Sequence, residues 1–246
     1  MLLEGKEMLV TGAASGIGRA TAIKCAGEGA SLTIADINED GLRETAGMIE
    51  GNVRTQTFDA LDYESCAKMV EVAASDGLDA VCNISGALKW GPSEEFAVED
   101  FDRLMRINAG SVFAICKAAL PHLVKTKGNI VNTASTAALQ GLAYSIAYSA
   151  SKHAVAAITK GLAVEYGAKG VRINAVCPGH VDTPMTQTPP PGGDVDWSLV
   201  MRNTPKLENG ICAPSDIAEL FVFLASDRAH KVTGSLYTMD GGQLAG

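Results

Sequence analysis

Short apolar runs alternate along the chain with longer stretches of helical pattern. Seven of the short runs are rich in β-branched residues, which predicts strands. These runs are residues 7–13, 31–36, 54–60, 78–85, 128–135, 172–179 and 235–242. Because nearly all of their positions are apolar, we expect both faces of the sheet to be covered, as in a parallel sheet.

Six helical stretches lie between these runs. They are residues 16–29, 39–50, 63–75, about 98–125, 147–167 and 214–226. Strands that alternate with helices predict parallel β-α-β units. We therefore expect an α/β fold, with residues 1–246 forming a single doubly wound Rossmann-type domain of about seven parallel strands with helices on both faces.

One segment breaks this alternation. Residues 182–213 hold five of the nine prolines and exceed the length of an ordinary connection, which indicates a functional lid or a disordered loop. Five large apolar side chains are more than a solvated linker needs, and they favour a substrate lid at about 182–213: Met185, Trp197, Leu199, Met201 and Leu207.

Composition excludes several classes of protein. Hydrophobic residues make up 47% of the 246 and charged residues 20%, a balance typical of a globular protein with a large core. The net charge of −8 argues against nucleic acid and against an anionic membrane surface as partners. Glu4 and Glu7 interrupt the apolar start, so we expect no signal peptide. No run reaches the roughly 18 uncharged apolar residues of a membrane span, and we expect a cytoplasmic protein.

The cysteines and histidines indicate no metal site. The six cysteines are scattered through apolar segments, without a CxxC pair or zinc-like spacing to histidine. We expect them to be small buried hydrophobes in a reducing compartment. The four histidines are isolated from one another.

Three glycines follow the first predicted strand, in the sequence LVTGAASGIGRA. Gly12, Gly16 and Gly18 lie at a strand-to-helix junction, where glycine allows a tight turn and close approach of backbone N–H groups to a ligand. The N–H groups that begin a helix favour anions. We expect this turn, with its intervening Ser15 and Ile17, to bind a pyrophosphate.

Asp36 ends the second predicted strand, 18 residues after Gly18. This spacing suits a carboxylate that accepts hydrogen bonds from an adenosine ribose and repels a 2′-phosphate. Neither Ser15 nor Ile37 supplies a cation that would attract such a phosphate. The sequence therefore favours NAD(H) over NADP(H). The alternative for Asp36 is a helix N-cap.

Tyr148 and Lys152 are predicted to lie one turn apart on one helix face. An unperturbed phenol has a pKa near ~10, and a nearby ammonium lowers that pKa. A cationic nicotinamide would lower it further, so that Tyr148 can exchange a proton with an alcohol or carbonyl while a hydride moves. Tyr144 has no lysine four residues later and is expected to form part of the pocket wall.

Other polar residues fall near this pair. Ser135 ends the fifth predicted strand, at the edge of the sheet where ligands bind, and can donate a hydrogen bond to a substrate oxygen. Asn108 interrupts an apolar helical run. The alternatives are a Ser135 hydroxyl that bonds local backbone and an Asn108 amide that caps a kink.

The motifs together resemble the short-chain dehydrogenase/reductase family. They are TGAASGIG at 11–18, NISG at 83–86, the Tyr148 and Lys152 pair, and CPGHVDT at 177–183. NISG departs from the family's NNAG at Ile84 and Ser85. The resemblance implies a catalytic tetrad of Asn108, Ser135, Tyr148 and Lys152, with Asn108 binding a water that relays protons to Lys152. It also implies a homotetramer.

The resemblance further implies the residues that contact the cofactor. Asp59 would contact the adenine ring. The remaining positions implied in this way are Ala60, Asn83, Gly86, Tyr148, Lys152, Pro178, Gly179, Val181 and Thr183.

These observations predict an NAD(H)-dependent oxidoreductase that acts on a small-molecule secondary alcohol or ketone, with Tyr148 as general acid/base. The expected substrate pocket is apolar and suits a cyclic compound: Leu88, Trp90, Tyr144 and Met185. Lys89 and His180 are candidates for a polar contact, with plain surface positions as the alternative. Two other functions stay open, a 3-oxoacyl-carrier-protein reductase that uses NADPH and a non-catalytic NAD-binding sensor or scaffold.

Overall fold

The computed structural model describes residues 1–187 and 195–245, and its centre is a sheet of seven parallel strands in the order β3-β2-β1-β4-β5-β6-β7. The predicted α/β class and strand number are confirmed. The strands are β1 Glu7–Thr11, β2 Ser31–Asp36, β3 Val53–Thr57, β4 Ala80–Asn83, β5 Asn129–Thr133, β6 Arg172–Pro178 and β7 Leu236–Met239.

The strands end earlier than the apolar pattern predicts. The run 7–13 leaves the sheet after Thr11, and the run 128–135 leaves it after Thr133. Three of the four extra residues, Gly12, Ala134 and Ser135, line the groove described below. Ala13 and Ala134 still donate backbone hydrogen bonds to the neighbouring strands, at the Ala35 and Val176 carbonyl oxygens, which is why the apolar pattern continues past the strand ends.

Eight α-helices connect or follow the strands in the described residues. They are α1 Gly16–Gly27, α2 Glu39–Gly47, α3 Tyr63–Ala73, α4 Val98–Met105, α5 Ser111–Thr126, α6 Ile146–Tyr166, α7 Trp197–Met201 and α8 Pro214–Ala225. The single helix predicted over about 98–125 consists of α4, a π-helical turn at Arg106–Gly110, and α5. The short helix α7 lies within the segment predicted to be a lid, of which residues 188–194 lie outside the described residues.

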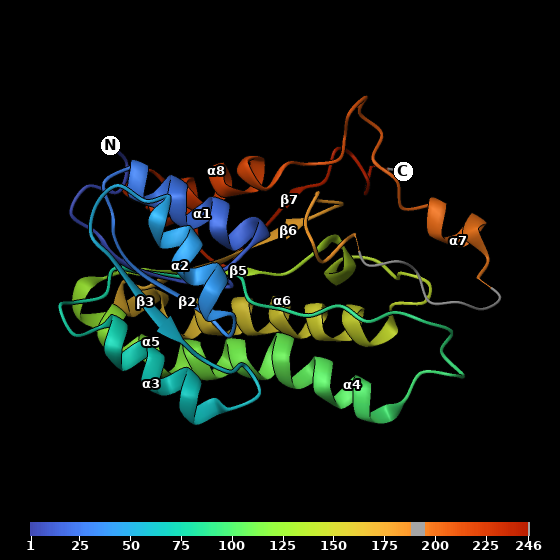
Figure 1. Ribbon diagram of the computed structural model, residues 1–246, viewed down its shortest axis with the longest axis horizontal. Coiled ribbons are helices and arrows are strands. Elements are labelled where there is room, and N and C mark those ends of the chain that lie inside the picture. Colours follow the sequence, from blue (N-terminus) through green and yellow to red (C-terminus); the bar gives the residue numbers. More distant parts are fainter. Residues whose placement is uncertain (188–194, 246) are drawn as a thin grey trace.

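The helices form two layers around the sheet. Helices α1 and α8 lie above it in Figure 1, whereas α3, α5 and α6 lie below. Successive strand residues pack into opposite layers, because side chains alternate across a strand. Leu9 and Val81 thus belong to the core between the sheet and helices α3, α5 and α6. Val10 and Cys82 belong to the core between the sheet and helices α1 and α8.

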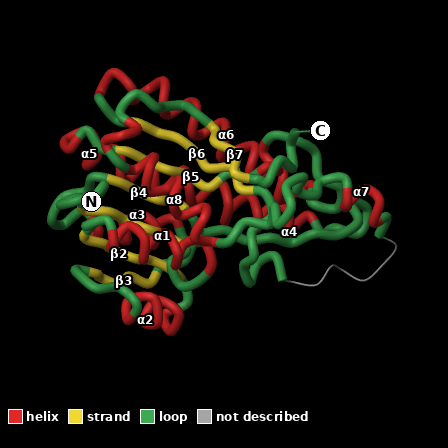
Figure 2. The backbone as a smooth tube through the Cα atoms, turned by 90° about the horizontal axis from the view of Figure 1, so that it is seen from above, coloured by secondary structure: helices red, strands yellow, loops and turns green. Residues whose placement is uncertain are grey.

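The strand order places a crevice at one end of the sheet. The chain builds β1, β2 and β3 outward in one direction and then returns to add β4 on the other side of β1. The loops after β1 and β4 therefore diverge, which is where open α/β sheets bind ligands. Figure 2 shows the strands in this order, with α7 and its neighbouring loops extending beyond one end of the sheet.

The stretch Val98–Thr126 is long and apolar enough to cross a membrane by length and composition alone. It contains an 18-residue window with a mean hydropathy of 1.3, and 56% of that window is buried inside the protein. Its apolar side chains pack in the core: Val112, Ile115, Leu120 and Leu123 share a cluster with residues of α3 and α6. Core helices meet the same criteria as membrane-spanning ones.

The contact between α1 and the turn after β1 yields a prediction about stability. A Cβ atom at Gly18 would overlap the carbonyl oxygen of Gly12, which is backbone and can move only with the turn. We expect Gly18→Ala to lower the free energy of unfolding by about 1–3 kcal/mol. For a chain of this size, each kcal/mol lowers the melting temperature by roughly 2–4 °C.

Gly161→Ala is the matched control, because no atom lies within 4 Å of a Cβ atom at this exposed position of α6. It should leave the melting temperature unchanged or raise it, since alanine favours a helix. Equal melting temperatures for Gly18→Ala and the unaltered protein would contradict the argument.

Candidate active site

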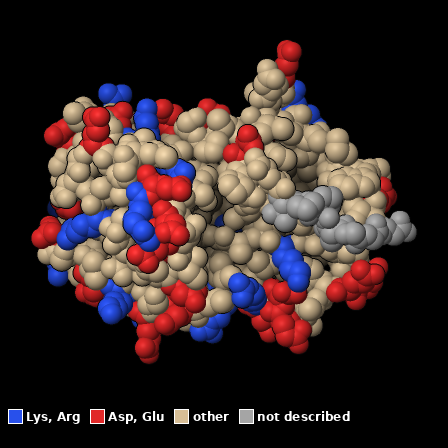
Figure 3. Space-filling view, viewed as in Figure 1, with Lys and Arg blue, Asp and Glu red and all other residues tan. Residues whose placement is uncertain are grey.

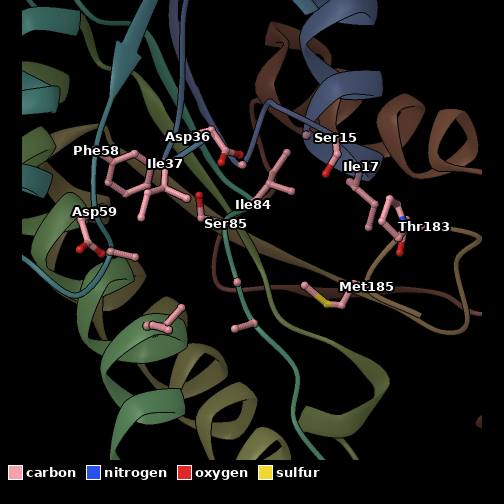
Figure 4. A pocket seen from close by; sticks show the side chains of 18 of the residues that line it. Ser15, Ile17, Asp36, Ile37, Phe58, Asp59, Ile84, Ser85, Thr183 and Met185 are labelled. Carbon is pink, nitrogen blue, oxygen red and sulfur yellow. The ribbon is translucent and has the colours of Figure 1, made fainter. Parts of the chain in front are cut away.

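A cleft of about 620 Å³ opens at the carboxyl ends of β1 to β4. Figure 4 shows Phe58, Ile37 and Asp59 at one end of it and Ile17, Thr183 and Met185 at the other, with Ile84 and Ser85 between them. The predicted cofactor residues that line it are Gly12, Ser15, Gly16, Ile17, Gly18, Asp36, Asp59, Ala60, Gly86 and Thr183.

The glycine turn is built for close contact with a ligand. Gly12 has φ +71, and a Cβ atom there would lie 2.8 Å from the backbone nitrogen of Ser85. Gly16 has φ +50, which also favours glycine. Ser15 precedes α1 as its N-cap residue, but its side chain makes no capping hydrogen bond. The first N–H groups of α1 are thus left for an anion at this end of the cleft.

Asp36 connects the glycine turn to the loop after β2. One carboxylate oxygen accepts a hydrogen bond from the Ala14 N–H at 3.2 Å, and the other accepts one from the Asn38 N–H at 3.0 Å. The N-cap of α2 is Asn38, whose side chain accepts from the Gly41 N–H, so the alternative of Asp36 as a helix cap is wrong. Asp36 still lines the cleft.

Asp59 follows β3 at the far end of the cleft (Figure 4). One of its carboxylate oxygens accepts a hydrogen bond from the Leu61 N–H at 2.8 Å, which fixes the loop. The apolar Ile37 and Phe58 lie beside it. Ile37 is 66% exposed, so this end has an apolar surface on which a flat ring can pack.

A smaller hollow of about 90 Å³ adjoins the first cleft. The two share five residues, including Gly86, Thr183 and Met185, so they form one continuous groove. Of the predicted residues, the smaller hollow adds Ser135, Tyr148, Lys152, Pro178, Gly179 and Val181. The tertiary structure therefore joins the serine, the tyrosine and the lysine to the glycine turn.

Lys152 is almost completely buried, with 4% of its surface exposed. Its ammonium donates a hydrogen bond to the Thr133 carbonyl oxygen at 2.8 Å and lies 5.7 Å from the ring centroid of Tyr148. It lies on the face of α6 that carries Val155 and Thr159, both also buried. Burial lowers the pKa of Lys152 to about 8, against a small opposing effect of Cys177.

Tyr148 corrects one expectation. The sequence predicts that Lys152 lowers the pKa of the phenol, but within the protein burial raises the pKa of Tyr148, and a hydrogen bond with Ser135 opposes that rise only in part. The cause is that desolvation disfavours the charged phenolate by more than this hydrogen bond favours it, while Lys152 directs its ammonium to Thr133. Proximity alone does not activate this tyrosine.

Ser135 combines its two predicted roles. Its hydroxyl oxygen accepts a hydrogen bond from the Ala137 N–H at 3.1 Å and so caps the 3₁₀ turn Thr136–Ala138. The same side chain lines the hollow beside Tyr148. The local backbone bond therefore orients the serine toward the site.

Asn108 lies in the π-helical turn and is fully buried. Its amide exchanges two hydrogen bonds with the backbone of Ala87, at 2.8 and 2.9 Å, and donates a third to the Ser151 hydroxyl at 3.0 Å. This is the predicted alternative of a buried amide at a helix irregularity. These bonds to Ala87 hold the loop after β4 in place. The loop lies beside Lys152, since a Cβ atom at Gly86 would be 3.2 Å from the Asn108 side chain and 3.7 Å from the lysine nitrogen. The water relay stays a prediction.

Asn83 is a further correction. It does not line the groove: its side chain is buried within the sheet, where it donates to the Asn132 side-chain oxygen at 2.8 Å. Asn83 is the last residue of β4 and pairs with Asn132 of β5, so its side chain belongs to the covered face of the sheet and not to the loop that lines the groove.

The predicted substrate residues divide into two groups. Met185 lines both parts of the groove, whereas Leu88, Trp90 and Tyr144 lie outside its lining. Lys89 is an exposed residue that forms an ion pair with Asp100, and His180 is exposed, as their surface alternatives predict.

Some residues of the groove are not among the predicted site residues. Ile37, Phe58, Ile84 and Ser85 lie within two residues of the ends of β2, β3 and β4, so their position at the carboxyl ends of the strands is a signal that could identify them. Arg103 and Ile107 reach the cleft from α4 and the π-helical turn, and only the packing of that helix brings them there.

Comparisons with known proteins agree with this geometry. Residues 12–243 match the family model described as Enoyl-(Acyl carrier protein) reductase. The chain is 34% identical to 2,5-dichloro-2,5-cyclohexadiene-1,4-diol dehydrogenase LinX of Sphingobium indicum, covering 99% of this chain and 98% of that protein. It is also 34% identical to 3-oxoacyl-[acyl-carrier-protein] reductase FabG of Thermotoga maritima, covering 98% and 99%.

A solved structure is similar over the full length of both chains. It is a short chain dehydrogenase from Mycobacterium paratuberculosis bound to NAD, with a TM-score of 0.93, 29% identity and 100% of each chain covered.

The buried lysine yields a prediction about pH. With a pKa of about 8 in the folded protein and 10.5 in the unfolded chain, Lys152 costs about 3 kcal/mol of stability at pH 7. The unfolded chain binds more protons between these values, so this cost disappears as the pH rises from about 8 to about 10.5. We expect Lys152→Met to be more stable than the unaltered protein at pH 7, with an advantage that shrinks across this interval.

Urea unfolding at several pH values measures the difference. Lys160→Met removes an exposed lysine from the same helix and should show no such trend. An advantage of Lys152→Met that does not change with pH would show that the lysine is not desolvated.

Proposed function

The chain belongs to the short-chain dehydrogenase/reductase family, and on this basis we propose that it is an NAD(H)-dependent oxidoreductase that acts on a secondary alcohol or ketone. One observation carries the proposal. Ser135, Tyr148 and Lys152 line a hollow that is continuous with a cleft large enough for a dinucleotide.

In this proposal Tyr148 exchanges the proton. Ser135, oriented by its bond with Ala137, donates a hydrogen bond to the substrate oxygen and holds it beside the phenol. When bound, an oxidised nicotinamide accepts the hydride and adds a positive charge that lowers the pKa of the phenol. Lys152, whose ammonium lies 5.7 Å from the centroid of the Tyr148 ring, stabilises the phenolate, and it is charged at neutral pH although burial lowers its pKa to about 8.

Asp36 supports the preference for NAD(H). Its carboxylate lines the cleft where the adenosine ribose would lie, and a 2′-phosphate there would meet its negative charge. Arg19, which contacts the same turn, does not offset this charge. Its guanidinium already donates to the Ala14 carbonyl at 2.6 Å and pairs with Glu44 at 2.8 Å.

The substrate we propose is an apolar or cyclic alcohol or ketone. Met185 contributes an apolar wall to both parts of the groove. Leu88, Trp90 and Tyr144 would extend that wall where the substrate projects beyond the nicotinamide. The name of the Sphingobium indicum relative, a dehydrogenase of a cyclohexadiene diol, agrees with this class.

A 3-oxoacyl-carrier-protein reductase is the second candidate. The name of the Thermotoga maritima relative favours it. An NADPH preference would support this candidate, and Asp36 argues against it. We also propose a cytoplasmic homotetramer; light scattering measures the number of subunits.

Replacing the proposed acid/base tests the chemistry. Tyr148→Phe removes only the hydroxyl, and we expect turnover to fall by a factor of about 10² to 10⁴. Binding of NADH, followed by its fluorescence, should stay within twofold. Tyr166→Phe, at the other end of α6, is the control and should keep full turnover. A Tyr148→Phe variant with normal turnover would remove the tyrosine from this role, whereas an unaltered protein inactive on a broad panel of alcohols and ketones would favour the sensor.

The second test concerns the cofactor. We expect kcat/KM to be at least tenfold higher with NADH than with NADPH, a difference of about 1.4 kcal/mol in transition-state stabilisation. Asp36→Ala should reduce this ratio because it removes the repulsive charge. A preference for NADPH in the unaltered protein would overturn the argument from Asp36 and favour the carrier-protein reductase.

A further inference from the structure

Tyr144 adopts an unusual backbone conformation near the catalytic tyrosine. Its φ is +61, a region that bulky side chains rarely occupy. It lies in the loop between Ser135 and Tyr148, four residues before the latter. Such strain persists only where surrounding contacts enforce it, and it is common at functional sites.

Two hydrogen bonds connect Tyr144 to two distant segments. Its carbonyl oxygen accepts from the Gly91 N–H at 2.8 Å, in the loop that follows β4. Its phenol oxygen accepts from the Asp196 N–H at 2.9 Å. The left-handed backbone thus lets one residue bond a loop with its main chain and the lid segment with its side chain.

A second contact joins the same two segments. Trp90, which precedes Gly91, and Trp197, which follows Asp196, pack edge to face with ring centroids 6.4 Å apart and an interplanar angle of 84°. Such pairs are favourable beyond the area they bury. Trp197 is nevertheless 51% exposed, so this contact lies at the surface and not in the hydrophobic core. We call the contacts of Tyr144 with Gly91 and Asp196, together with the Trp90–Trp197 pair, the clasp.

Helix α7 lies apart from the two layers of helices. Figure 1 shows α7 beyond the end of the sheet, away from the layers of helices that enclose the strands. The Asp196 carboxylate caps α7 by accepting a hydrogen bond from the Ser198 N–H at 2.8 Å. Asp196 therefore both begins α7 and donates its backbone N–H to Tyr144.

The loop after β4 is itself attached to the tetrad. Ala87 exchanges hydrogen bonds with Asn108, and Gly91, four residues later, bonds Tyr144. The clasp therefore joins the lid segment to a loop whose position Asn108 already determines. Away from the grey atoms, the middle of the face drawn in Figure 3 carries mostly uncharged side chains.

We propose that Tyr144 is a positioning residue that holds α7 against the loop after β4, and that this contact limits the space in which a substrate extends beyond the residues that line the groove. Its effect on catalysis rests on the proposed function, but the clasp itself does not. Tyr144 acts through Trp90, Trp197 and the Asp196 backbone. It affects substrate affinity, and the proton transfer remains with Tyr148.

The chain supplies its own spectroscopic probe. Trp90 and Trp197 are its only two tryptophans, so tryptophan fluorescence and near-ultraviolet circular dichroism report on the pair directly. We expect Tyr144→Phe, which removes only the phenol oxygen, to shift the emission to longer wavelength. Its tryptophan dichroism should weaken toward that of Trp197→Phe. Tyr166→Phe should change neither signal. These measurements need no substrate.

Kinetics then separate positioning from chemistry. We expect Tyr144→Phe to raise KM for the ketone about fivefold, in proportion to one lost hydrogen bond, with kcat and NADH affinity within twofold. Tyr144→Gly, which accommodates the positive φ, is the second variant and should show the same rise in KM or a larger one. It keeps the test valid if Tyr144→Phe folds poorly.

Two results would overturn the proposal. One is an unchanged tryptophan dichroism in both variants, which would show that Tyr144 does not hold the pair. The other is a loss of kcat without a change in KM, which would assign the residue to the chemistry. An unaltered protein without turnover would defeat the proposed function, while the spectroscopic result would still decide whether the clasp exists.

Discussion

The site depends on a lysine that the fold keeps away from water. The Lys152 ammonium donates a hydrogen bond to the Thr133 carbonyl oxygen at the end of β5, and almost none of the lysine surface is exposed. Desolvation is costly for an ammonium and lowers its pKa. A protein selected for stability alone would place an apolar residue here. The burial makes sense if the charge is needed at the base of the groove, where low polarity strengthens its effect on a neighbouring phenol or ligand.

The elements around Lys152 depart from regular structure in a coordinated way. The long helix contains a π-helical turn that brings Asn108 to the backbone of Ala87, and π-helical turns are frequent at functional sites. Gly86 then fits between Asn108 and the lysine because it has no side chain. Each of these irregularities lowers the stability locally, and the packing of the regular helices against the sheet offsets that loss.

The groove is continuous because strands on both sides of β1 end at the same level. The glycine turn after β1, Asp36 after β2 and the loop after β4 form the larger part, and Ser135 after β5 begins the smaller part. A ligand that spans both parts contacts the connections that follow six strands, β1 to β6. Binding such a ligand therefore depends on the register of the whole sheet, and distant changes in packing should affect it.

The sequence by itself determined the seven strands, the helices between them, the glycine turn and the Tyr148–Lys152 pair. These features depend on local periodicity and on spacing within one element, which the order of residues specifies. Tertiary structure decided what depends on contacts between distant segments. It turned the last residues of the predicted strands into the lining of the groove, directed Asn83 into the sheet, and divided one predicted helix at Asn108. It also raised the pKa of Tyr148 instead of lowering it, because desolvation depends on the segments that cover the phenol. It bonded Tyr144 to Asp196, a contact between residues 52 positions apart that leaves no pattern in the local sequence.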